Sequence, residues 1–196
     1  MTALRVVFDP NLKKEYEVLF STAKLSERGL HYSDPILKKI MAGKPRYEAV
    51  AKIVGCPWWL VGVIHHMEAS NDFSKHLHNG DPLAKQTVHV PAGRPPGKPP
   101  WTWEASAIDA LNECRHFNKW HDWSLSGCLW QIELFNGLGY RQYHPMVKSP
   151  YLWSMTNIYK KGKYTSDGHF DPEAVSTQLG VAAIMKRGFD TKQFSI

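Results

Sequence analysis

The 196-residue sequence has few cysteines, no long apolar run and no secretory signal pattern. Its three cysteines, Cys56, Cys114 and Cys128, form no Cys-x-x-Cys pair, which favours reduced thiols over a disulfide framework or a cysteine-based zinc site. No stretch of 18 or more apolar residues occurs, so we expect no transmembrane segment. The first residues lack a charged segment followed by an apolar core, which predicts synthesis in the cytoplasm without a cleaved leader.

Several common catalytic motifs are also missing. The sequence contains no Gly-rich phosphate loop, no Gly-x-Ser-x-Gly turn and no His-Glu-x-x-His pair. The ten histidines include His76 and His78, but they do not show the ligand spacing of a zinc site. We therefore expect neither a metal nor another cofactor.

The formal net charge of +6 favours a polyanionic partner, which includes nucleic acid, an anionic membrane or the bacterial cell wall. The basic residues are spread in small clusters and are not interleaved with aromatic residues on one segment. No recognition-helix pattern stands out, so we expect no specific nucleic-acid binding.

The pattern of apolar residues predicts an α+β protein that is mainly α, with one buried central helix and a small β-hairpin. The one compositional break, Pro91 to Pro100, is interpreted as a loop inside a single domain of residues 1–196. Within this domain, residues 1–45 are interpreted as a helical N-terminal attachment. Helices are predicted over residues 11–25, 35–41, 45–54, 57–67, 102–117, 172–187 and from 124 to either 137 or 139. A further helix is predicted to start at Ser149-Pro150. The hairpin is predicted over residues 77–90, with short extended pieces around residues 163–170.

The most informative stretch is the helix that ends near Glu68 and the turn-rich segment that follows it. Glu68 has apolar neighbours and lies near the carboxyl end of its helix, and both features favour a protonated carboxylic acid. Asp81 follows an Asn-Gly turn signal, and Thr87 lies six residues further on. A protonated acid facing a second carboxylate is the arrangement that cleaves a glycosidic bond with water. We therefore expect Glu68 to act as general acid and Asp81 to activate water with help from Thr87.

This order of residues resembles the Glu-Asp-Thr triad of phage-type lysozymes and endolysins, and the Asp-x5-Thr spacing is the same. The segment Glu68-Ala69-Ser70 is similar to the Glu-Ser motif of goose-type lysozymes and lytic transglycosylases, with an alanine inserted. The segment from Leu134 to Tyr140 resembles their Ala-Tyr-Asn-x-Gly motif, with Phe135 in place of tyrosine. The resemblance implies a lysozyme-like fold and a lysozyme-type glycoside hydrolase, and the two departures favour hydrolysis over anhydro-sugar formation.

Polar and aromatic residues outside this triad are candidate sugar contacts. Aromatic faces stack on sugar rings, and amides bond N-acetyl groups. The candidates are His78, Gln131, Asn136, Tyr140, Tyr151 and Trp153. Glu133 is a rival second carboxylate, but its place among apolar helix residues favours a structural ion pair.

The resulting hypothesis is a monomeric peptidoglycan hydrolase, an N-acetylmuramidase whose partner is the wall glycan strand. It is interpreted as a phage endolysin that stays in the cytoplasm until release and then acts on the cell wall in the periplasm. The alternatives are a lytic transglycosylase or chitinase-like glycosidase and, from another class, a nucleic-acid-binding or assembly protein.

Overall fold

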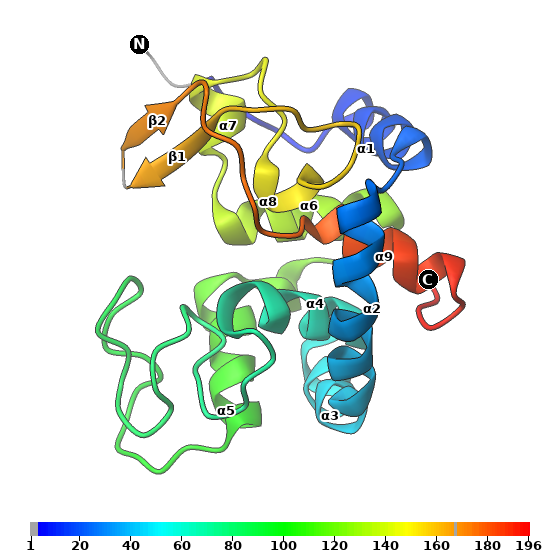
Figure 1. The fold of residues 1–196 in the computed structure, drawn as a ribbon. Helices are drawn as coiled ribbons and strands as arrows, with labels where there is room; N and C mark the ends of the chain where they lie inside the picture. The colour runs from blue at the N-terminus through cyan, green and yellow to red at the C-terminus, as the bar shows by residue number, and fades with distance from the viewer. Residues whose placement is uncertain (1–3, 167) are drawn as a thin grey trace. The chain divides into compact units, whose positions relative to one another are not determined.

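The computed structural model describes residues 4–166 and 168–196. Within them the chain forms nine α-helices, two short helices of other types and one two-stranded antiparallel sheet (Figure 1). The mainly helical α+β class predicted from the sequence is therefore confirmed. The chain divides into two compact units: a terminal unit of residues 1–37 and 124–195, and a central unit of residues 38–123 together with Ile196.

The terminal unit is built around the buried helix α6, against which α1 and α8 pack, while α8 also packs on α9. Its elements are α1 (Pro10–Thr22), the first part of α2 (Glu27–Ala42), α6 (Leu125–Asn136), α7 (Gly139–Tyr143), α8 (Pro150–Trp153), β1 (Lys163–Ser166), β2 (His169–Asp171) and α9 (Val181–Asp190). As predicted, Ser124 caps α6 by accepting the Gly127 N–H, and Gly137 ends the helix at a φ of 99°. The two strands lie in the stretch where short extended pieces were predicted.

The central unit contains α3 (Lys44–Val54), α4 (Trp58–Ala69), α5 (Trp103–Ile108), the π-helical η1 (Asp109–Cys114) and the 3-10 helix η2 (Phe117–Lys119). Helix α4 is buried on almost every side, as its all-round apolar sequence predicts. Its His65 packs with Tyr47, Phe73 and Trp103, and burial lowers the pKa of His65 to about 4. The imidazole is thus a neutral core group near pH 7, bonded to the Tyr47 hydroxyl at 2.9 Å.

No single helix in the described part of the chain is long and apolar enough to cross a membrane. Helices α3 and α4 meet that length and composition only when taken together, and they are bent by 112° where they join.

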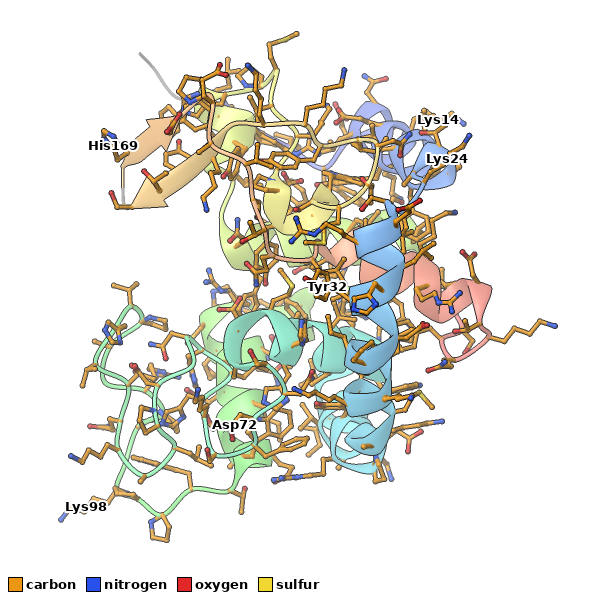
Figure 2. The ribbon with its side chains drawn as sticks, viewed as in Figure 1. Lys14, Lys24, Tyr32, Asp72, Lys98 and His169 are labelled. Carbon is orange, nitrogen blue, oxygen red and sulfur yellow. The ribbon has the colours of Figure 1, made fainter. Side chains whose placement is uncertain are left out.

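The predicted hairpin over residues 77–90 is wrong. Among the described residues of this stretch the only pairing is an isolated bridge between Lys75 and Pro82. The backbone of the stretch is bonded locally instead, since the Thr87 N–H donates to the Arg94 carbonyl and the Gly93 N–H donates to the Thr87 carbonyl. Pro82 has no N–H to donate, and the backbone N–H groups of Val88 and His89 donate to the Asp81 carboxylate rather than to a partner strand. Residues 70–102 therefore form a long folded loop, from which Lys98 points outward (Figure 2).

The last helix is predicted to begin at Pro172 but begins at Val181. The carboxylate of Asp171 does accept the N–H groups of Glu173 and Ala174, in the manner of a helix cap. The chain then turns away because its backbone bonds other segments: the Ala174 carbonyl accepts the Gly162 N–H, and the Ser176 N–H donates to the Tyr159 hydroxyl. These tertiary hydrogen bonds replace the first turns of the predicted helix.

Two other boundaries differ from the sequence prediction. Helix α2 begins at Glu27 and continues through Pro35, where the predicted helix was to start. Thr102 caps α5 as expected, but regular α-helix stops at Ile108 and the wider π-helical turns of η1 follow.

Candidate active site

Glu68 lies in the last turn of α4, and its side chain is only partly exposed. The helix is followed by its C-cap residue Ser70, which has a φ of 54°. The turn at Gly80 packs directly on this end: a Cβ on Gly80 would lie 2.6 Å from the backbone oxygen of Glu68. Gly80 also has a φ of 79°, a conformation that favours glycine. The Asn-Gly turn therefore brings the segment that carries Asp81 against the end of the helix that carries Glu68.

Asp81 is 6% exposed, and its carboxylate is held by three donors. It accepts the backbone N–H groups of Val88 at 2.8 Å and His89 at 3.0 Å, and it pairs with His89 Nδ1 at 2.6 Å. Burial raises the pKa of Asp81, but the bonds from His89 and Val88 outweigh it and bring the pKa to about 2. Asp81 is thus an anion throughout the neutral range, which suits a group that stabilises positive charge or orients water.

Thr87 is 3% exposed and uses its hydroxyl within the loop. The hydroxyl donates to the Pro91 carbonyl at 2.5 Å and accepts the Arg94 N–H at 2.9 Å. These bonds fix the start of the proline-rich segment. The structure therefore gives Thr87 a loop-holding role and does not support the predicted water shared between Thr87 and Asp81.

His78 is buried, so its predicted role as a sugar contact is not supported. Its Nε2 lies 2.9 Å from Asp109, and Arg94 holds the same carboxylate through two nitrogens. Burial lowers the pKa of His78 more than Asp109 raises it. Together with Cys114, His78 and Asp109 place three potential metal-ligand atoms within 4.8 Å of one another, a cluster that the sequence spacing did not reveal. The guanidinium of Arg94 already neutralises the Asp109 carboxylate. The bonds of His78 and Arg94 to Asp109 therefore connect the loop of residues 70–102 to η1.

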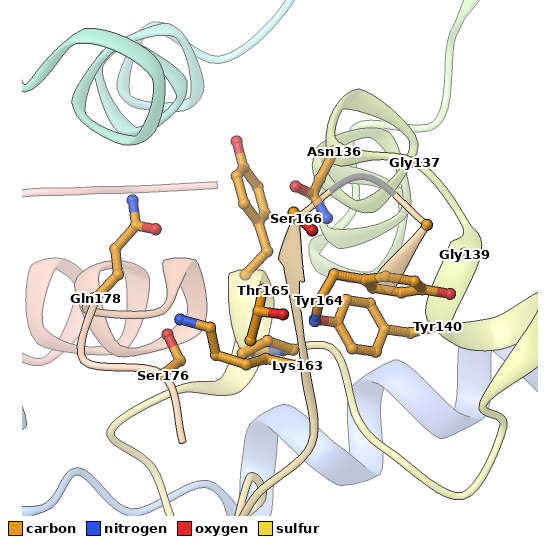
Figure 3. A pocket seen from close by; sticks show the side chains of 13 residues that line it. Asn136, Gly137, Gly139, Tyr140, Lys163, Tyr164, Thr165, Ser166, Ser176 and Gln178 are labelled. Atoms are coloured by element: carbon orange, nitrogen blue, oxygen red, sulfur yellow. The ribbon is translucent and has the colours of Figure 1, made fainter. Parts of the chain in front are cut away.

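The terminal unit contains a pocket of about 480 Å³, within the range of roughly 300–1,000 Å³ that is typical of small-molecule sites. Figure 3 shows it between the end of α6, the strand β1 and the loop before α9. The residues that line it are Asn136, Gly137, Gly139, Tyr140, Pro150, Tyr151, Lys163, Tyr164, Thr165, Ser166, Gly168, Ser176 and Gln178.

Three of the predicted sugar contacts, Asn136, Tyr140 and Tyr151, lie together in this pocket. Trp153 and Gln131 do not line it, since helix packing buries both of them. Sequence reasoning missed the lining residues from β1 and from the loop at residues 176–178. The extended pattern of residues 163–170 was visible, but nothing in the sequence shows that this strand lies beside Asn136.

Glu133 is a buried carboxylate held in an ion pair, as its helical setting predicted. It accepts Arg141 Nε at 2.7 Å and also the Tyr16 hydroxyl. Burial and the neighbouring Glu133 raise the pKa of Tyr16, so the phenol stays protonated and can donate. Arg141 also reaches Glu15, which completes an ion-pair network inside the terminal unit.

Comparisons with known proteins give no further guide to the site. No protein-family model, curated protein or solved structure matches this chain.

Proposed function

We propose that this protein is a peptidoglycan hydrolase of the N-acetylmuramidase type, with Glu68 as general acid. The observation that carries the proposal is the packing of the Gly80 turn on the Glu68 carbonyl. It joins the carboxylic acid at the end of a buried helix to a loop in which Asp81 is ionised at neutral pH. Glycoside cleavage requires one protonated and one ionised carboxyl group, and we assign these roles to Glu68 and Asp81.

In the proposed reaction Glu68 delivers its proton to the oxygen of the glycosidic bond. The bond between that oxygen and the anomeric carbon then breaks, and positive charge develops on the sugar ring. Asp81 stabilises this charge and orients the water that attacks the anomeric carbon. The proton of the attacking water leaves to solvent or to the exposed His89 that is paired with Asp81.

A polysaccharide substrate is supported by the pocket in the terminal unit. Tyrosine rings there offer flat apolar faces, and the amides of Asn136 and Gln178 offer both donors and acceptors. The net charge of +6 suits an anionic wall. We further propose that the protein is a phage endolysin that acts as a monomer on the wall after release from the cytoplasm.

A lytic transglycosylase is the second candidate, and the geometry around Asp81 and Thr87 favours it. With a pKa of about 2, Asp81 is a weak base, and the Thr87 hydroxyl is bonded inside the loop. Transglycosylation needs no activated water, because the muramic acid's own hydroxyl closes an anhydro ring.

The experiment is digestion of purified peptidoglycan, with products identified by mass spectrometry. Hydrated muramic ends support the muramidase, anhydro ends support the transglycosylase, and release of neither contradicts both. A chitin arm tests the chitinase-like alternative. If the wall stays intact while DNA binding falls steeply with salt, the protein belongs to the nucleic-acid-binding class instead.

A further inference from the structure

Both oxygens of the Asp81 carboxylate are engaged in hydrogen bonds. Oδ2 accepts the backbone N–H groups of Val88 at 2.8 Å and His89 at 3.0 Å, and Oδ1 lies 2.6 Å from Nδ1 of the His89 ring. Burial raises the pKa of Asp81, but these bonds outweigh it and bring the pKa to about 2. The Asp81 carboxylate is therefore suited to holding a neighbouring group and poorly suited to removing a proton from a nucleophile.

The bond to Asp81 determines which nitrogen of the His89 ring carries a proton. An ionised carboxylate can only accept, so Nδ1 of His89 must donate in the 2.6 Å bond. In the neutral ring the lone pair then lies on Nε2. The side chain of His89 is 76% exposed, and within the described part of the chain no group bonds its Nε2. This nitrogen is thus an oriented proton acceptor that faces no group of the protein.

The loop of residues 70–102 contains two further histidines, and neither has this arrangement. His78 also pairs with a carboxylate, since its Nε2 lies 2.9 Å from Asp109, but its ring is buried. His76 is buried as well, and it uses both of its ring nitrogens in hydrogen bonds. Of the three, His89 alone combines a carboxylate partner with an exposed ring.

Asn79 connects His89 to the turn that packs on the end of α4. The Asn79 side chain donates from Nδ2 to the His89 carbonyl at 3.0 Å, and its Oδ1 accepts the Asp81 N–H, also at 3.0 Å. The adjacent Gly80 approaches the Glu68 backbone oxygen so closely that a Cβ would lie 2.6 Å from it. One turn therefore carries both the Asp81–His89 pair and the contact with the helix end that holds Glu68.

We propose that His89 is the general base of the reaction and that Asp81 also acts as its positioning residue. This inference rests on the proposed function, since it needs Glu68 to cleave a glycosidic bond. His89 Nε2 takes a proton from the attacking water as the water oxygen bonds to the anomeric carbon, and Glu68 gives its proton to the departing sugar oxygen.

The Asp81 carboxylate stabilises the resulting imidazolium, as a carboxylate does for the histidine of a catalytic triad. His89 then returns its proton to solvent, and Glu68 regains one from solvent. If the nucleophile is the hydroxyl of muramic acid that closes an anhydro ring, His89 accepts the proton of that hydroxyl in the same way. The role of His89 is thus common to hydrolysis and transglycosylation.

The test measures peptidoglycan digestion by full-length wild type, His89→Ala and His121→Ala, together with binding of a GlcNAc–MurNAc tetrasaccharide. His121 is the matched control, because it is an exposed histidine of the same unit and the described residues give it no carboxylate partner. We expect His89→Ala to lower kcat by about 100- to 1,000-fold while the tetrasaccharide still binds. Added imidazole should restore part of this loss, because it supplies a diffusible base. His121→Ala should behave like the wild type with and without imidazole.

Nitrogen-15 NMR of the ring at alkaline pH tests the geometry apart from catalysis, with the spectrum of His89→Ala identifying the His89 signals. We expect the neutral ring to be protonated at Nδ1. Protonation at Nε2, a His89→Ala rate within a few-fold of the wild type, or a loss that imidazole does not reverse overturns the proposal.

Failure of this inference differs from failure of the proposed function. If the wild type and His89→Ala digest the wall equally well, the base is wrongly assigned and the hydrolase remains. If the wild type releases no fragments, the proposed function is wrong and the role of His89 in it is wrong as well.

Discussion

Individual side chains determine how charge is distributed around Glu68. Asp81 is kept ionised by the backbone N–H groups of Val88 and His89 and by the His89 ring. The same bonds contribute to stability, since they favour the charged form in the folded protein only.

Asp81→Asn should lower the free energy of unfolding by about 1–2 kcal/mol at pH 7. The pKa of Asp81 is about 2 when folded, below the value of about 3.9 expected when unfolded. Its contribution is therefore complete above about pH 4 and is lost as the pH falls toward 2.

Urea unfolding at pH 7, 4 and 2.5 measures this dependence. The gap between wild type and Asp81→Asn should narrow as the pH falls, whereas Asp190→Asn, at the exposed end of α9, should leave stability nearly unchanged at each pH. A gap that stays constant down to pH 2.5 would show that the Asp81 carboxylate is not held as described.

A second residue-level prediction concerns the buried carboxylate of Glu133. Arg141→Met removes its 2.7 Å partner and leaves the charge in the core of the terminal unit. Loss of one member of a buried pair costs about 3 kcal/mol. Thermal or urea unfolding should show this loss. The ion pair of Arg187 with Asp34 is exposed, so Arg187→Met should have a much smaller effect. If the two substitutions lowered the free energy of unfolding equally, burial would not be what sets the contribution of an ion pair to stability.

At the level of elements, the contact between the Gly80 turn and the end of α4 positions the candidate site. Gly80→Ala would force a Cβ to within 2.6 Å of the Glu68 carbonyl, besides straining a φ of 79°. We expect a loss of more than about 2 kcal/mol and a displacement of the loop that carries Asp81.

Gly93→Ala is the matched control for this prediction. Gly93 has a similar φ of 74°, but a Cβ there meets nothing within 4 Å. It should therefore cost only the strain of the backbone conformation, about 1 kcal/mol. Chemical unfolding of both variants separates the two costs, and a Gly93→Ala protein that is as unstable as Gly80→Ala would argue against the contact.

Local sequence signals predicted most of the helices and failed in two loops. Capping residues and apolar periodicity located α3, α4 and α6 because those signals act within a few residues. The hairpin and the start of the last helix failed because side-chain and tertiary hydrogen bonds compete with the regular ladder there. Asn136, Tyr140 and Tyr151, which the sequence predicts as sugar contacts, line one pocket, whereas Lys163 and Gln178 could be placed there only from the folded chain because they are distant in sequence.

At the scale of the whole molecule, the chain divides into two compact units. The central unit carries Glu68 and Asp81, on which the proposed cleavage depends, and the terminal unit carries a pocket lined by Asn136, Tyr140 and Tyr151. Because no protein-family model matches the chain, the proposed function depends on the chemistry of its own residues and above all on Glu68.

The decisive measurement is the rate at which Glu68→Gln releases fragments from purified peptidoglycan, relative to the wild type. Glutamine keeps the shape of the side chain but cannot deliver a proton, so the rate should fall by about 100- to 10,000-fold while glycan binding persists. Glu48→Gln, at an exposed position on α3, should digest the wall like the wild type. Activity of Glu68→Gln within a fewfold of the wild-type rate would contradict general acid catalysis by this residue.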